Sequence, residues 1–184
     1  MTQGRAGHLA RDFITLQKAA QDIASVADNT SASFVFFPMS TGSPYDDRVA
    51  NGLISSRCKF WKKNLCVYDK LSVQDTLNLV SACDAVISTR LHSSIFSVLA
   101  NVPFVDLIHH DKNESFLRTC DLQEFGISYW SFGSHQLKTH LNKMLAGEVD
   151  LSAAKQSQEV LLQESLKYVR FDQPTWSDTS NIQG

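Results

Sequence analysis

Two basic side chains, Arg90 and His92, stand where one apolar segment ends and another begins. Residues 85–87 form an apolar run too short for a helix, which predicts a buried strand. From Leu91 onward apolar residues recur at helical spacing, so the basic pair is expected between a strand end and a helix start. Ligands of open parallel sheets bind at this edge, where a helix N-terminus offers free N–H groups. Because a guanidinium pairs well with carboxylate or phosphate, we predict a site for an anionic substrate.

The same junction also has a purely structural interpretation. Arg90 could pair with a neighbouring acid such as Asp84, and His92 could cap the helix or pack in the sheet crevice. Ser88 and Thr89 carry hydroxyls suited to accepting from the free N–H groups of the helix. Because helix starts often carry a basic residue without any ligand, the residue types alone leave both interpretations open.

An acidic pair is expected at the same edge of the sheet. The apolar run 34–37 predicts a strand, and a loop rich in Gly, Ser and Pro follows it and leads to Asp46 and Asp47. Both acids are well placed to cap the helix predicted over 46–56, and capping alone would explain them. Their place on the presumed ligand side keeps a functional role open.

A third group of polar residues follows the strand predicted over 103–108. His109, His110, Asp111 and Lys112 come directly after it. Neighbouring side chains on a strand point to opposite faces, so the two imidazoles are not expected to share an ion, and we predict no metal site.

Helix and strand patterns alternate about five times along the chain, which predicts an α/β fold with a doubly wound, mainly parallel sheet. Pro103 and Asn101 end the helix after Arg90, and Ser72 with Asp75 resembles a capping box. The chain opens on a helix where such a sheet normally begins with a strand, so a first strand is expected to be missing. Strands are predicted at 34–37, 65–68, 85–87, 103–108 and 127–130, and helices at 8–28, 46–56, 72–83, 91–99, 114–120, 134–147 and 151–170.

Bulk properties narrow the class of protein. The 184 residues with a formal charge of −2 suit one domain over 1–150 with a helix and tail over 151–184, and give no general attraction to nucleic acid. No apolar run approaches the roughly 20 residues of a membrane span, and no signal peptide is recognised, so a cytoplasmic protein is expected. The four cysteines show no close pair and are expected to be reduced thiols. No GxGxxG, GxxxxGK[ST] or GxSxG motif is present, which disfavours common nucleotide and hydrolase sites.

The region 37–112 resembles the polysaccharide pyruvyl transferase family. The most specific element is the signature Arg90, Leu91, His92 at a strand end. It is followed by small residues, a helix, and a strand that begins at the Val102–Pro103 pair. The other matching pieces are a strand ending in Pro38 and Met39, the pair Asp46 and Asp47, a helix capped by Ser72, the segment ACDAVISTRLHSSIFSVLANVPFVDL, and Asp111 with Lys112.

This resemblance implies a fold and an activity. Members look like two-domain GT-B enzymes, and the matching part is the C-terminal, Rossmann-like donor-binding domain. They transfer the enolpyruvyl carbons of phosphoenolpyruvate onto two sugar hydroxyls as a ketal, release phosphate, and need no further cofactor. Their products belong to exopolysaccharide and cell-envelope synthesis.

The resemblance also implies roles for individual residues. Arg90 and His92 would contact the donor, with Arg90 binding its carboxylate or phosphate and His92 acting as general acid or phosphate partner. Asp47 would orient His92 or accept a proton from the acceptor hydroxyl. The substrate site would be completed by Ser88, Thr89, Leu91, Lys112 and Asp46.

Three functions therefore remain open. The first is a pyruvyl transferase, represented here by its donor-binding part, with a sugar or polysaccharide as acceptor. The second is a non-catalytic module that binds an anion or a sugar. The third is a fragment of a GT-B glycosyltransferase that uses a nucleotide sugar. An uncovered sheet edge leads us to expect a homodimer or a missing N-terminal domain.

Overall fold

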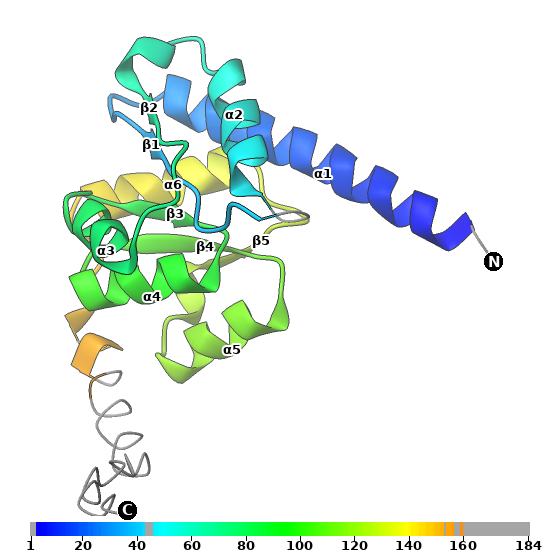
Figure 1. The fold of residues 1–184 in the computed structure, drawn as a ribbon. Helices are drawn as coiled ribbons and strands as arrows, with labels where there is room; N and C mark the ends of the chain where they lie inside the picture. The colour runs from blue at the N-terminus through cyan, green and yellow to red at the C-terminus, as the bar shows by residue number, and fades with distance from the viewer. Residues whose placement is uncertain (1–2, 43–45, 153, 157–158, 160–184) are drawn as a thin grey trace, which may run out of the picture.

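A computed structural model describes residues 3–42, 46–152, 154–156 and 159, with side chains described from residue 13. The fold is α/β and Rossmann-like, as the alternating pattern predicts (Figure 1). The helices are α1 (Gln3–Asp28), α2 (Asp47–Arg57), α3 (Val73–Ser81), α4 (Leu91–Ala100), α5 (Asp111–Thr119) and α6 (Ser134–Leu145), with 3-10 turns η1 (Trp61–Lys63) and η2 (Gln123–Phe125). The strands are β1 (Val35–Phe36), β2 (Leu65–Cys66), β3 (Val86–Ser88), β4 (Phe104–Ile108) and β5 (Gly126–Ser128).

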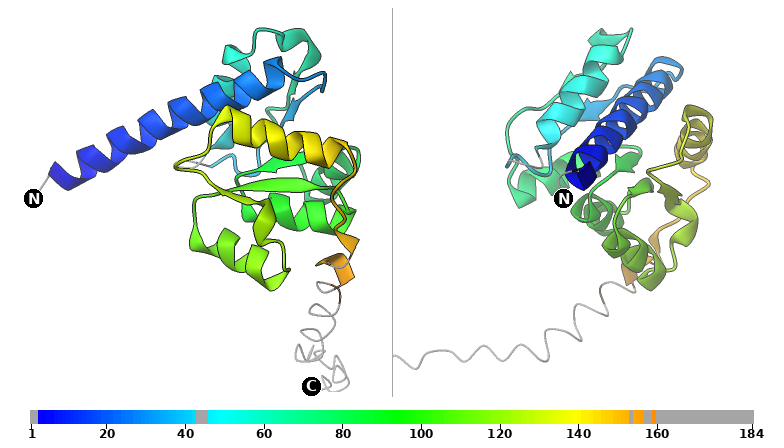
Figure 2. Two further views of the ribbon diagram at one scale, coloured as in Figure 1. Left: turned by 180° about the vertical axis from the view of Figure 1, so that it is seen from behind. Right: turned by 90° about the vertical axis from the view of Figure 1, so that its right-hand side faces the viewer.

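All strand pairs are parallel, and helices cover both faces of the sheets. Alternate residues of β4 point to opposite sides, with Val105 and Leu107 in one apolar cluster and Phe104 in the other. The first cluster is completed by α1, α2 and α6, and the second by α3, α4 and α5 (Figure 2). This two-sided burial explains why β4 reads as a continuous apolar run. Asp106, the exception within that run, is fully buried.

The strands fall into two groups among the described residues. β1 pairs with β2, and β3, β4 and β5 form a separate sheet in that order. Backbone hydrogen bonds from Leu65 and Val67 to the carbonyls of Phe34 and Phe36 fix the first pair. No strand of the described chain pairs with the other edge of β1 or of β3. The missing first strand stays a prediction.

The helix ends follow the local signals in the sequence. Asn101 has a positive φ of 56° at the end of α4, and the Ser72 hydroxyl accepts from the Asp75 N–H at the start of α3. The helical spacing of Val73, Leu77 and Val80 predicts a buried stripe for α3, but Val73 is 72% exposed because it is the first helical residue and faces solvent. The predicted strand at 34–37 is shorter than expected, and α5 begins three residues earlier, at Asp111.

Several further expectations can be compared with the described residues. All four cysteines are free thiols, with Cys58 and Cys120 buried. Most of the helix predicted over 151–170, and the tail after it, lie outside the described residues. In the part of the chain that the structure describes, no helix combines the length and apolar character that crossing a bilayer requires.

The packing of β4 yields a first prediction. Leu107 of β4 is fully buried in the apolar cluster that α1, α2 and α6 complete. Leu107→Ala should therefore lower the free energy of unfolding by about 2–5 kcal/mol. Val73→Ala, at an exposed position, should change it by no more than about 0.5 kcal/mol. Urea unfolding of both variants measures the difference. Equal effects would contradict the burial of Leu107 in this apolar cluster.

Candidate functional site

Arg90 lies at the carboxyl end of β3 and is the N-cap residue of α4. Its backbone is held by Ser88, whose hydroxyl accepts from the Arg90 N–H at 3.2 Å and lies 2.9 Å from the Arg90 carbonyl oxygen. α4 has no side-chain cap, so the expectation that Ser88 and Thr89 cap its N–H groups is wrong. Ser88 holds the residue before the helix instead. The Ser93 N–H already donates to the Arg90 carbonyl at 2.9 Å, so among the described residues the N–H groups of Leu91 and His92 are left for another acceptor.

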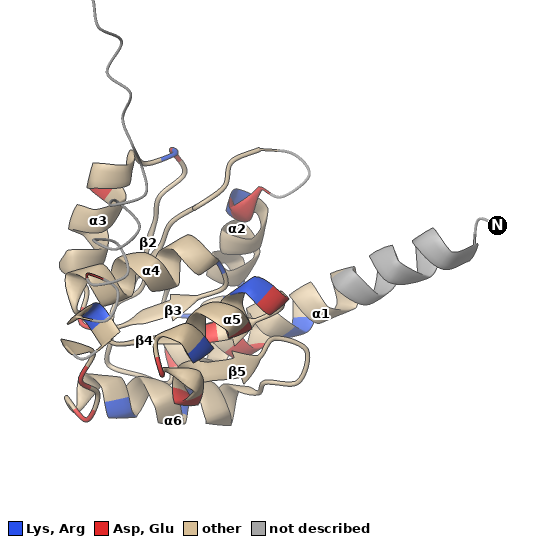
Figure 3. Ribbon diagram, turned by 90° about the horizontal axis from the view of Figure 1, so that it is seen from below, with Lys and Arg blue, Asp and Glu red and all other residues tan. Residues whose placement is uncertain are grey.

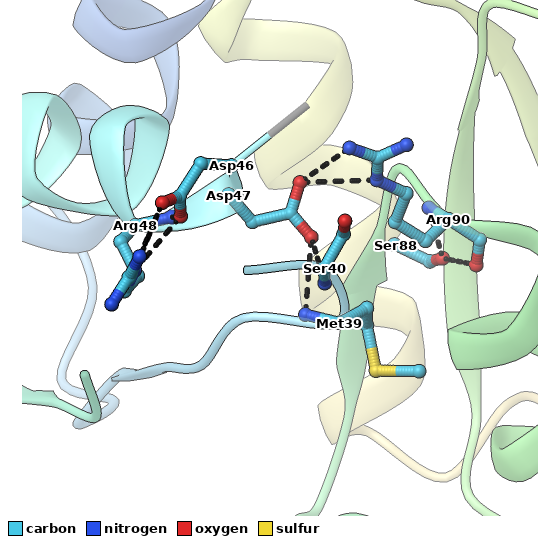
Figure 4. Close-up of polar contacts among 7 residues, drawn as sticks. All are labelled: Met39, Ser40, Asp46, Asp47, Arg48, Ser88 and Arg90. Carbon is cyan, nitrogen blue, oxygen red and sulfur yellow. Dashed lines mark hydrogen bonds and ion pairs between the residues drawn. The ribbon is translucent and has the colours of Figure 1, made fainter. Parts of the chain in front are cut away.

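The Arg90 guanidinium is oriented by Asp47, the first residue of α2. Its Nε and one terminal nitrogen lie 3.0 Å and 2.6 Å from Asp47 Oδ1 (Figure 4). The other carboxylate oxygen, Oδ2, accepts from the backbone N–H groups of Met39 and Ser40 at 3.0 Å and 2.9 Å. Because the side chains of Arg90 and Asp47 are 28% and 17% exposed, water screens this ion pair only partly.

The two neighbouring acids have different surroundings. Asp46 caps α2 by accepting from the Arg48 N–H at 3.0 Å, and it also pairs with the Arg48 guanidinium. This pair is exposed, and the Arg48 hydrogen bonds lower the pKa of Asp46. Figure 3 shows acidic and basic residues together at the start of α2. Asp47, in contrast, faces Arg90, so capping alone does not explain the acidic pair.

His92 and Lys112 lie at the same edge of the sheet without joining the ion pair. His92 is exposed in the first turn of α4 and makes no hydrogen bond or ion pair with the described residues. Lys112 is exposed beside Asp111 in the first turn of α5, after the carboxyl end of β4. Leu91 and Thr89 are half-buried. The structure thus joins Arg90 and Asp47 directly and leaves two basic side chains at solvent-facing positions nearby.

His109 is a candidate for this site that sequence reasoning considered only as a metal ligand. Its Nδ1 is buried and has no hydrogen-bond partner among the described residues. Burial lowers the pKa of His109, and the charges of His110, Arg90 and Lys112 lower it further. The His109 imidazole therefore lies within the electrostatic reach of both cations. The sequence could have indicated His109 as a site residue, because it directly follows a predicted strand on the ligand side of the sheet.

The two adjacent histidines do not point apart as expected. Their ring centroids are 4.0 Å apart, and the ring of His109 also lies 5.7 Å from that of Tyr129. The chain has left the strand at Ile108, and His110 already serves as the N-cap residue of α5, so strand alternation does not apply. Within the described ranges, no group of three or more His, Cys, Asp or Glu residues could hold a metal ion.

Comparison with known proteins gives a match to a protein family. A family model described as polysaccharide pyruvyl transferase matches residues 8–111, which is more than half of the 184 residues. The matched region includes Asp47, Arg90 and His92 and ends one residue before Lys112. None of the curated proteins and none of the solved structures compared with the chain matches it.

The different surroundings of the two acids lead to a prediction. Asp47→Asn should lower the free energy of unfolding by roughly 1–3 kcal/mol, because it removes the charge that pairs with a partly buried guanidinium. Asp46→Asn should have a much smaller effect, because its ion pair is exposed and asparagine still caps a helix. Chemical denaturation of both variants tests the difference. A larger loss for Asp46→Asn would contradict the assignment of Asp47 as the partner of Arg90.

Proposed function

The chain belongs to the polysaccharide pyruvyl transferase family, and on this premise we propose that Arg90 binds phosphoenolpyruvate as the pyruvyl donor. The observation that carries the proposal is the guanidinium held by Asp47 beside the uncapped start of α4. The donor carries a carboxylate and a phosphate, and both groups suit a guanidinium and helix N–H groups. The family implies a sugar or polysaccharide as acceptor.

The proposed reaction assigns a task to each charged side chain. One acceptor hydroxyl adds to the central carbon of the donor while a proton is delivered to its methylene carbon. This hydroxyl gives up its own proton as it adds, which balances the proton delivered to carbon. A second hydroxyl then forms the other ketal bond, the bond from carbon to phosphate oxygen breaks, and the proton of the second hydroxyl leaves with the phosphate. His92 is proposed to deliver the proton or to contact phosphate, and Lys112 to balance the charge of the leaving phosphate.

The surroundings of Asp47 favour a role that differs from both of its expected ones. Both of its oxygens are engaged, one with Arg90 and the other with the backbone at Met39 and Ser40. Each oxygen already accepts two hydrogen bonds, and these fill the roughly four acceptor positions of a carboxylate. We therefore propose that Asp47 orients Arg90, rather than His92 or an acceptor hydroxyl.

We also propose that this chain is the donor-binding part of a larger assembly. Dinucleotide-type sheets have the strand order 3-2-1-4-5-6. The observed pairs β2-β1 and β3-β4-β5 correspond to strands 3-2 and 4-5-6 of that order. A parallel strand between β1 and β3 would complete one continuous sheet, and a further domain would then supply the acceptor site.

Unpaired strand edges make self-association the expected behaviour of this chain in isolation. The edges of β1 and β3 between which a further strand would fit have no strand partner among the described residues, and such edges pair readily with another chain. Light scattering should therefore detect a homodimer or larger species at micromolar concentration. A monodisperse monomer would contradict this expectation.

Donor binding can be tested directly by calorimetry. Phosphoenolpyruvate should bind the wild-type chain saturably, and Arg90→Ala should weaken binding at least tenfold, because it removes a paired hydrogen-bond donor of the anion. Arg48→Ala is the matched control, since Arg48 forms the exposed ion pair one residue from Asp47. Circular dichroism confirms that each variant is folded.

Three outcomes would count against the proposal. They are no binding by the folded wild-type chain, equal weakening in both arginine variants, and tight binding of a nucleotide sugar in place of phosphoenolpyruvate. The last of these would favour a glycosyltransferase-type donor domain. Binding without turnover after the acceptor domain has been supplied would favour the non-catalytic module.

A further inference from the structure

A line of buried polar side chains lies behind Arg90, at the junction between β3 and α4. Ser88 of β3, Ser94 of α4, Asp106 of β4 and Asn113 of α5 are each no more than 1% exposed, and we call them the buried polar cluster. Four successive elements of the fold thus each contribute one member. Groups buried this completely find most of their hydrogen bonds within the protein, although the Asn113 side-chain oxygen has no partner among the described residues.

The oxygen atoms of the cluster form a continuous line that ends on Arg90. Asp106 Oδ2 lies 2.6 Å from Ser94 Oγ, Ser94 Oγ lies 3.0 Å from Ser88 Oγ, and Ser88 Oγ lies 2.9 Å from the Arg90 carbonyl oxygen. The Asn113 amide nitrogen donates to the Asp106 carboxyl at 2.9 Å and 3.0 Å. Each step in the line is therefore an oxygen-to-oxygen contact at hydrogen-bond distance.

Counting protons along this line gives the protonation state of Asp106. The three contacts need three protons, one between each pair of oxygens. The Ser88 and Ser94 hydroxyls supply two, and the Arg90 carbonyl supplies none. We infer that Asp106 is a neutral, protonated carboxylic acid that donates to Ser94, which donates to Ser88, which donates to the Arg90 carbonyl. With an ionised carboxylate, one of the three contacts would place two oxygens together without a proton.

The surroundings of Asp106 support this protonation state independently. The described residues that contact its carboxyl from α4 and α5 are Ser94 and Asn113, and neither carries a charge. An ionised carboxylate buried without a cation is strongly disfavoured. Burial accordingly raises the pKa of Asp106, and its contacts with Ser94 and Asn113 offset only part of this effect.

The neutral acid makes Asp106 a positioning residue for Arg90. Its proton completes the line that holds the Ser88 hydroxyl on the Arg90 backbone, while Asp47 holds the guanidinium of the same residue. The effect on the donor rests on the proposed function, whereas the protonation state does not. Loss of the proton would disrupt the line, so the geometry of the Arg90 backbone depends on a buried acid 16 positions further along the chain.

The protonation state predicts a direction for the pH dependence of stability. Because the pKa of Asp106 is higher in the folded than in the unfolded chain, its proton favours the folded state most at acidic pH. This contribution to stability should decline as pH rises from about 4, the usual value of an aspartic acid, through the raised folded value. Asp106→Asn should lack this decline, because the amide mimics the neutral acid and can donate to Ser94.

The first test is spectroscopic and needs no ligand. Infrared spectra of the wild-type chain at neutral pH should contain the carbonyl band of a protonated carboxylic acid, absent from Asp106→Asn and retained in the exposed control Asp84→Asn. Urea unfolding across pH should show Asp106→Asn at least as stable as the wild type at pH 8. Absence of the band, or marked destabilisation by Asp106→Asn at that pH, would overturn the inference.

The second test concerns the positioning role. Asp106→Ala should weaken phosphoenolpyruvate binding at least tenfold, and Asp106→Asn should restore the wild-type affinity. Ser94→Ala, which removes one hydroxyl of the line, replaces Asp106→Ala if that variant does not fold. Unchanged affinity in a folded Ala variant would overturn the positioning role. A wild-type chain that shows the acid band but binds no phosphoenolpyruvate would refute the donor proposal and leave the protonation state standing.

Discussion

The ion pair between Asp47 and Arg90 connects two parts of the fold that share no strand pairing in the described chain. Asp47 belongs to the part built on β1 and β2, and Arg90 to the part built on β3, β4 and β5. One carboxylate oxygen binds the guanidinium, and the other binds the loop after β1. The carboxyl edges of both sheets are thereby held together at the point where a ligand of an α/β protein is expected.

This arrangement has a consequence for anion binding. A guanidinium that already faces a carboxylate has lost part of its attraction for a second anion, but its direction is fixed in advance. An incoming carboxylate or phosphate therefore needs a further favourable partner. The uncapped N–H groups of α4 can provide one, and the exposed His92 and Lys112 lie at the same edge of the sheet.

The sequence predicted the local features of this site well because local features depend on neighbouring residues. The end of α4 at Asn101 and the cap at Ser72 follow from side chains a few positions apart. The partner of Arg90 lies 43 positions away, whereas the sequence suggested a neighbouring acid such as Asp84. Only the parallel arrangement of the strands selects Asp47. The family resemblance identified the same residue without predicting this contact.

The surroundings of Asp106 and of the two adjacent histidines were not predicted, because the pattern of these residues indicated only a strand. Asp106 lies within an apolar run that correctly predicted a buried strand, and the run gave no sign that α4 and α5 would supply Ser94 and Asn113 around it. His109 and His110 were assigned strand geometry one residue beyond the point where the strand ends. In both cases the packing of neighbouring helices, which a single sequence does not specify, decided the surroundings of the side chain.

The start of α4 breaks the usual rules for a helix N-terminus, and this supports a functional reading of the site. Its N-cap residue is a cation, its first turn contains no acid, and no side chain caps it. A cation at this end of the helix dipole is unfavourable by about 0.3–1 kcal/mol, and a missing cap by about 1 kcal/mol more. The fold maintains this arrangement through Asp47 in front of Arg90 and the buried polar cluster behind it. A bound anion would supply the negative charge and the hydrogen-bond acceptors that this helix start lacks. Local rules are broken in this way most often where a protein binds its ligand.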